Sequence, residues 1–188
     1  LKAISDIFEP GSVIKPLTMA FLLEENPQLV HETVKTDPGY FYLDNHRIRD
    51  LGNNGTLTLE DILVHSSNVG ISNLVLENAS GKLCDFWSQF SLMQGSQIEF
   101  RPEGHGDLPK YILPGSFSEA TMSFGYGFKM NLIQLAQLYA VIAGDGTFKP
   151  VTLLAGDKSH REDKQIFSEQ TVLKMRQILQ APVARGTA

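Results

Sequence analysis

The stretch that decides the fold is Glu9-Pro10-Gly11-Ser12-Val13-Ile14-Lys15-Pro16, which places a serine and a lysine three residues apart. An apolar pattern at helical spacing follows this stretch to about Glu25, and Asn26-Pro27 predicts the end of that helix. Residues three apart lie on one face of a helix, so the Lys15 ammonium can approach the Ser12 hydroxyl. The pattern is typical of a reactive serine, or of a serine that caps a helix with a solvated lysine one turn on.

The chemistry of Ser12 depends on what Lys15 does. A serine hydroxyl is a weak nucleophile until a base removes its proton. A lysine can be that base only if its pKa is lowered, which burial and nearby positive potential would do. The N-terminus of the predicted helix supplies positive potential, and its free N–H groups can help to hold a developing oxyanion. Ser12 and Lys15 are therefore the candidate nucleophile and its base.

A second polar cluster, Ser66-Ser67-Asn68, interrupts a helical pattern that begins near Thr58 and resumes to about Asn78. The cluster supplies hydroxyl and amide groups on a short loop between two helices. Such groups can relay a proton to a leaving amine and hydrogen-bond a substrate amide. The alternative is another helix N-cap, which serine and asparagine also favour.

The rest of the chain predicts more helix than strand. Residues 32–57 and 94–118 are rich in glycine, proline and polar residues and predict irregular structure, with short strand or turn pieces such as Phe41-Tyr42-Leu43. Further predicted elements are a helix over 82–90, a strand or turn over 123–127, a helix from the N-cap Asn131 to 143, a strand over 148–154 and a helix over 168–179.

Composition excludes several classes of function. The 188 residues are 42% hydrophobic and 20% charged, with a formal net charge of -5 and a pI of about 5.5. Nucleic acid is not expected as a partner, because phosphate binding needs a basic face. The sequence contains no run of about 18 apolar residues, so no membrane span is predicted in it. The single cysteine, Cys84, excludes an internal disulfide, and none of the five histidines forms an HExxH-like pair, so no metal is expected.

Taken together, the motifs resemble those of class B penicillin-binding proteins. The segment 8–16 is similar to the family's first motif, and Ser66-Ser67-Asn68-Val69-Gly70 is similar to the second, in the form of the division-specific transpeptidases. Residues 51–63 resemble the segment that leads into the second motif. Residues 123–127, followed by 134–140, resemble a later core segment. These segments span nearly the whole chain and come in the family's order.

The resemblance implies an α+β fold of the penicillin-binding transpeptidase and serine β-lactamase type. Residues 1–188 would form part of a single transpeptidase domain. The family's third motif, K-T-G, is absent, and Gly186-Thr187-Ala188 does not replace it because Arg185 is not the motif lysine. We therefore expect a chain truncated before K-T-G, mainly the helical part, with most of the central antiparallel sheet missing. The isolated 188 residues are expected to acylate poorly or not at all.

The resemblance also implies roles for four residues. Ser12 would attack the penultimate D-alanine of a D-Ala-D-Ala stem peptide and form an acyl-enzyme, with Lys15 as the base. Ser66 would pass a proton to the leaving amine, and Asn68 would hold the substrate amide. An amine of a neighbouring stem peptide would then complete the cross-link during septal cell-wall synthesis. β-Lactams would acylate Ser12 as substrate mimics, and no metal or organic cofactor is needed.

The implied partners are peptidoglycan stem peptides, β-lactam antibiotics and proteins of the division machinery. The implied location is the periplasmic face of the bacterial inner membrane, with the anchor outside these residues. Two other interpretations remain. A serine β-lactamase would need a deacylating base, and no E-x-x-x-N segment of the class A type is present. A non-catalytic β-lactam sensor or scaffold domain would not need Ser12 for cross-linking.

Overall fold

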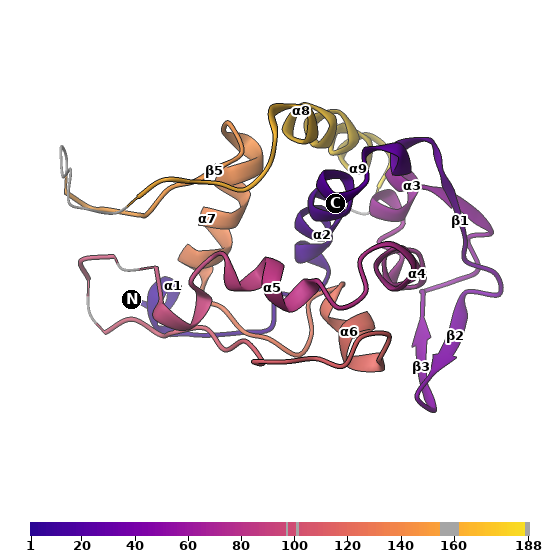
Figure 1. Cartoon of the computed structure of the whole chain (residues 1–188), viewed down its shortest axis with the longest axis horizontal. Helices are drawn as coiled ribbons and strands as arrows, with labels where there is room; N and C mark the ends of the chain where they lie inside the picture. Colours follow the sequence, from indigo (N-terminus) through magenta and orange to yellow (C-terminus); the bar gives the residue numbers. More distant parts are fainter. Residues whose placement is uncertain (97, 101, 155–161, 187–188) are drawn as a thin grey trace.

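The computed structural model describes residues 1–96, 98–100, 102–154 and 162–186, which form a helical body with small sheets at its edges (Figure 1). Thr187 and Ala188 lie outside the described residues. The α-helices are α1 (Lys2–Ser5), α2 (Lys15–Glu25), α3 (Leu59–Val64), α4 (Asn68–Asn78), α5 (Leu83–Ser88), α6 (Phe117–Met122), α7 (Leu132–Ala143), α8 (Glu169–Ile178) and α9 (Gln180–Arg185). The short 3₁₀ helices are η1 (Gly11–Ile14), η2 (Pro27–His31) and η3 (Leu92–Gln94).

Helix α2 lies at the centre of the body, between α4, α7 and α8 (Figure 1). Its side chains from Leu17 to Leu23 are buried on all sides of the helix. The sequence predicted an apolar pattern at helical spacing, but burial on α2 extends beyond one face, since Thr18 and Met19 are also fully buried. The difference arises because a helix surrounded by other helices buries its whole circumference.

The turn that carries Ser12 is a 3₁₀ helix and not the first turn of an α-helix. Helix η1 covers Gly11–Ile14, and α2 begins only at Lys15. Pro16 has no N–H to donate to the carbonyl of Ser12 four residues before it. The Lys15 N–H donates to that carbonyl instead, which is the three-residue spacing of a 3₁₀ helix. The sequence therefore selects the tighter turn through Pro16.

The described strands form three two-stranded antiparallel sheets and no larger sheet. They are β1 (Thr33–Lys35) with β4 (Thr56–Thr58), β2 (Tyr40–Leu43) with β3 (His46–Arg49), and β5 (Thr147–Phe148) with β6 (Lys164–Gln165). The expected α+β class, with only small sheets, is confirmed. Of the strand or turn expected near 41–43, the structure forms the strand, β2. The predicted strand over 148–154 is wrong beyond Phe148, because Pro150 cannot donate to a ladder.

Helix starts follow the capping residues of the sequence. The hydroxyl of Thr58 accepts from the Asp61 N–H at the start of α3, and Ser168 accepts from the Thr171 N–H at the start of α8. Asn131 and Gln134 form a reciprocal capping box on α7. The predicted last helix ends at Ile178, and the chain continues as α9, a separate helix that the sequence did not predict.

Candidate active site

The side chains of Ser12, Lys15 and Ser66 meet at the start of α2. The Lys15 Nζ donates to the Ser12 Oγ at 3.1 Å and to the Ser66 Oγ at 2.9 Å, and it also donates to the Ser66 carbonyl oxygen at 2.5 Å. Pro10 holds the N-cap position before η1, and no side chain caps this helix, so the capping role considered for Ser12 is wrong. The three polar side chains form one connected cluster.

The lysine and the two serines differ in how far they are exposed to solvent. The Lys15 side chain is 1% exposed, whereas Ser12 is exposed and Ser66 is half-buried. Burial lowers the pKa of Lys15 from 10.5 to about 8, although the nearby Asp50 carboxylate acts in the opposite direction. An ammonium with a pKa near 8 is neutral often enough near neutral pH to accept a proton. The cluster therefore combines an accessible hydroxyl with a buried amine suited to be its base.

The cluster Ser66-Ser67-Asn68 divides into residues with different tasks. Ser67 is the N-cap of α4, where its hydroxyl accepts from the Gly70 N–H at 2.8 Å. Ser66 lies one residue earlier in a left-handed conformation, with φ of 50°, which directs both its hydroxyl and its carbonyl to Lys15. The capping interpretation is therefore correct for Ser67 only, and it leaves Ser66 available to the cluster.

Asn68 has different bonding from the other three predicted site residues. It lies in the first turn of α4, is half-buried, and donates from Nδ2 to the Arg49 carbonyl at 3.1 Å. This bond ties α4 to the end of β3. Asn68 thus borders the Ser12–Lys15–Ser66 cluster through Ser66 and Ser67 and is not hydrogen-bonded to it.

Asp50 supports this arrangement, and the sequence reasoning did not identify it. One carboxylate oxygen accepts from the Ser67 Oγ at 2.6 Å, and the other accepts from the Val69 N–H at 2.9 Å. A carboxylate is favoured at the N-terminus of a helix such as α4. The only signal in the sequence is a lone acid 17 residues before Ser67, and no local spacing connects the two.

We expect Asp50→Asn to shift the pH dependence of Ser12 acylation to lower pH. The Asp50 carboxylate raises the pKa of Lys15, so its removal lets that pKa fall further. The measurement is the rate constant for acylation of the full-length protein by a β-lactam, plotted against pH. The pH at which this rate constant rises gives the shift. Asp145→Asn, which alters an exposed carboxylate on the β5 side of the molecule, is the control. A rise that stays in place or moves to higher pH contradicts the role given to Asp50.

Residues 123–127 hold the segment before Ser12 through hydrogen bonds. The Gly11 N–H donates to the Gly125 carbonyl at 3.0 Å, and the Gly127 N–H donates to Glu9 Oε1 at 2.8 Å. The sequence left a strand or a turn open for this segment, and the structure forms a turn. Gly125 has a φ of 95°, and a Cβ there would lie 2.1 Å from the Gly11 carbonyl oxygen. Only glycine allows this close approach of two backbones.

Two findings limit what else the described residues contain. No group of three or more His, Cys, Asp or Glu side chains among them is placed to hold a metal ion. None of their helices is long and apolar enough to cross a membrane.

Known proteins resemble this chain along its whole length. Residues 1–188 match the family described as penicillin binding protein transpeptidase domain. The probable peptidoglycan D,D-transpeptidase PbpC of Pseudomonas aeruginosa is 32% identical over 97% of this chain and 32% of its own length. The peptidoglycan D,D-transpeptidase FtsI of Escherichia coli is 31% identical over 98% of this chain and 32% of its own length. The chain thus spans about a third of these relatives.

Solved structures agree with the sequence comparison. The apo structure of the TP domain from Burkholderia pseudomallei penicillin-binding protein 3 superposes with a TM-score of 0.88 at 31% identity, covering 99% of this chain and 57% of that chain. Fold, order of motifs and sequence identity all agree. The chain therefore belongs to the penicillin-binding protein transpeptidase family, and within it resembles the FtsI transpeptidases of class B.

Proposed function

We propose that this chain carries the nucleophile half of a peptidoglycan D,D-transpeptidase that works through a serine acyl-enzyme. The observation that carries the proposal is the Lys15 amine, buried and bonded to both Ser12 Oγ and Ser66 Oγ. The relatives named peptidoglycan D,D-transpeptidases support the same reaction class. We place Ser12, Lys15, Ser66 and Asn68 in the roles of nucleophile, base, proton relay and substrate-binding residue.

The first half-reaction begins with neutral Lys15. Its amine takes the Ser12 proton while Ser12 Oγ attacks the carbonyl of the penultimate D-alanine. The Ser12 backbone N–H, near the start of η1, is one donor to the developing oxyanion. The C–N bond then breaks, and the leaving D-alanine amine receives a proton through the Ser66 hydroxyl, which Lys15 re-protonates at 2.9 Å. The product is an ester between Ser12 Oγ and the shortened stem peptide.

The second half-reaction reverses the proton transfers. An amine of a neighbouring stem peptide attacks the ester carbonyl and gives up a proton through Ser66 to Lys15. The ester bond breaks, and the proton on Lys15 returns to Ser12 Oγ. Asn68 would orient the substrate amide throughout. A β-lactam amide enters the same first step, and its opened ring remains attached to Ser12.

The biological setting is part of the proposal. The reaction is placed in septal wall synthesis, with division-machinery proteins as partners, because residues 66–70 resemble the second motif of the division-specific transpeptidases. We place the active site at the periplasmic face of the inner membrane, with the anchor outside these 188 residues. Peptidoglycan stem peptides and β-lactams are the proposed ligands.

Fluorescent penicillin labelling of the full-length protein tests the proposal. We expect one label per protein, located on Ser12 by peptide mass, and none on Ser12→Ala. Slow release of the label and cross-linking of stem peptides in vitro support a transpeptidase. Rapid hydrolysis of the acyl-enzyme would show a β-lactamase, and labelling without cross-linking would show a sensor. Labelling that survives Ser12→Ala contradicts the proposal outright.

A further inference from the structure

We propose that Tyr139 is a positioning residue for the nucleophile, because its hydroxyl holds the turn that carries Ser12. The inference rests on the proposed function of Ser12. Tyr139 lies on α7, 126 positions from the residue whose backbone it contacts, and it touches none of the reacting groups. Its effect would be on where Ser12 Oγ stands relative to Lys15 and the substrate.

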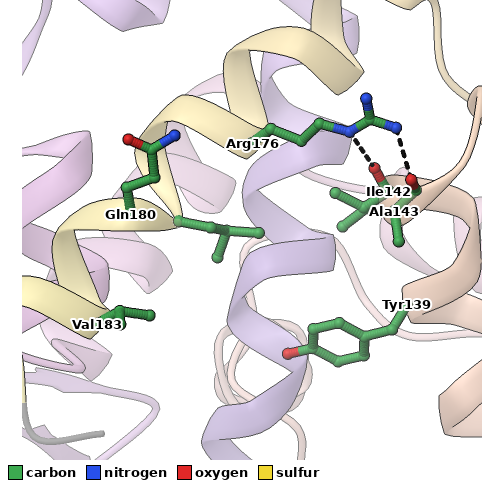
Figure 2. Close-up of a pocket in the computed structure, with 7 residues that line it drawn as sticks. Tyr139, Ile142, Ala143, Arg176, Gln180 and Val183 are labelled. Carbon is green, nitrogen blue, oxygen red and sulfur yellow. Dashed lines mark hydrogen bonds between the residues drawn. The ribbon is translucent and has the colours of Figure 1, made fainter.

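The contact is a short hydrogen bond from the Tyr139 hydroxyl to the Val13 carbonyl oxygen, at 2.5 Å. Val13 is the residue directly after Ser12 and lies within η1. Figure 2 shows the Tyr139 ring extending from α7, with its hydroxyl directed away from Arg176 and towards the pale indigo ribbon. The ring also lines an apolar pocket of about 390 Å³ between α7 and the α8–α9 pair.

The Val13 carbonyl lacks the donor that a 3₁₀ helix would normally supply. In a 3₁₀ helix it would accept from the N–H three residues on, but that residue is Pro16, which has none. The Val13 side chain is 49% exposed and does not anchor the turn by packing. The Ile14 side chain packs the end of the turn into the core, and the Tyr139 hydroxyl adds a bond at Val13, where the 3₁₀ donor is missing and the side chain is half-exposed.

The Tyr139 bond completes a set of hydrogen bonds along the turn. The Gly11 N–H is held by the Gly125 carbonyl, and the Ser12 carbonyl accepts from the Lys15 N–H. Tyr139 holds the next carbonyl along, at Val13. Consecutive backbone groups on both sides of the Ser12 side chain are thus fixed, and the catalytic geometry of a nucleophile tolerates little displacement.

The helix that presents Tyr139 is itself held at both ends. At its start, Asn131 and Gln134 form the capping box. At its end, the Arg176 guanidinium from α8 donates to the carbonyls of Ile142 and Ala143, at 3.3 and 2.6 Å, as the dashed lines in Figure 2 show. Burial raises the pKa of Tyr139 to about 12, so the hydroxyl stays a donor across the pH range of the enzyme.

The test is Tyr139→Phe in the full-length protein, with Ile142→Val as the matched control. Ile142 lies on the same helix and lines the same pocket, and it makes no side-chain hydrogen bond to the turn. We expect Tyr139→Phe to lower the first-order acylation constant about fivefold, the loss of one neutral hydrogen bond. The affinity of the non-covalent β-lactam complex should not change. The pH at which the acylation rate rises, which Lys15 sets, should also stay the same. Hydrogen exchange in residues 9–16 should become faster.

Four outcomes separate the possibilities. Normal acylation and normal exchange in Tyr139→Phe overturn the inference. Equal losses in Tyr139→Phe and Ile142→Val also overturn it, because packing of α7 would then explain both. If the wild-type full-length protein is not acylated at all, the proposed function fails instead. A selective loss of acylation rate in Tyr139→Phe, with the control near wild type, supports the inference.

Discussion

Lys15→Met in the full-length protein is expected to slow β-lactam acylation of Ser12 by about a thousandfold, a typical loss for removal of a general base. Methionine keeps the unbranched shape of the buried side chain and removes the amine. In the wild-type protein the rate should rise as pH increases through about 8, since only the neutral amine accepts the Ser12 proton. In the variant this rise of the rate with pH should disappear. Stopped-flow acylation between pH 6 and about 10 measures both effects.

The control for Lys15→Met is Lys82→Met. Lys82 is largely exposed and paired with Glu25, so its loss should leave acylation close to the wild-type rate. A variant of Lys15 that keeps a rate within a few-fold of wild type would remove lysine from the mechanism. If the acylation rate of Lys15→Met still rises through about pH 8, the group that titrates there is not Lys15.

The same substitution has a consequence for stability. The pKa of Lys15 is lower in the folded state than the 10.5 of an ordinary lysine. Between about pH 8 and pH 10.5 the unfolded chain therefore binds this proton more tightly, so stability from this group rises with pH across that window. Lys15→Met should remove that rise. Unfolding free energies of both proteins at the two ends of the window provide the measurement.

Gly125→Ala is expected to destabilise the protein and to reduce acylation about a hundredfold. The added Cβ would meet the Gly11 backbone, with its carbonyl oxygen 2.1 Å away, and neither backbone can rotate aside as a side chain can. The left-handed conformation costs an alanine about 1–2 kcal/mol, and forced overpacking adds about 1–3 kcal/mol. The turn before Ser12 must move to relieve the contact, which displaces Ser12, the proposed nucleophile.

The matched control for Gly125→Ala is Gly127→Ala. Gly127 has a similar positive φ of 80°, but nothing lies within 4 Å of a Cβ placed there. Gly127→Ala should lower the free energy of unfolding only by the cost of the left-handed conformation, about 1–2 kcal/mol. It should keep most of the wild-type acylation rate. Thermal unfolding and acylation kinetics of the full-length variants separate the two contributions. Equal acylation by both variants would show that the contact with Gly11 does not position Ser12.

The sequence predicts the parts of the site that depend on local spacing. Ser12 and Lys15 are neighbours because they are three residues apart in a helical segment, and the caps at Thr58, Asn131 and Ser168 follow from residue type alone. The family resemblance added Ser66 as a partner, and the structure places its hydroxyl on Lys15. The spacing did not predict which residue of the second cluster caps α4, because Ser66 and Ser67 have the same side chain.

The parts that the sequence does not predict depend on contacts between distant segments. Asp50, Gly125 and Tyr139 reach the site from 17, 114 and 126 positions away along the chain, as their bonds to Ser67, Gly11 and Val13 show. No helical or strand period connects such pairs. The 3₁₀ turn at Ser12 was predictable in principle from Pro16, but an apolar pattern at helical spacing does not distinguish a 3₁₀ turn from an α-helical one.

The left-handed conformation of Ser66 has a consequence for how such a chain can change over generations. Glycine would occupy that backbone at lower energy, and an apolar side chain would replace the buried Lys15 amine with less loss of hydration. At both positions the residue that best stabilises the fold differs from the residue that the proposed chemistry requires. A descendant that no longer needs the proposed acylation should drift towards glycine at position 66 and an aliphatic residue at position 15, while its core stays the same.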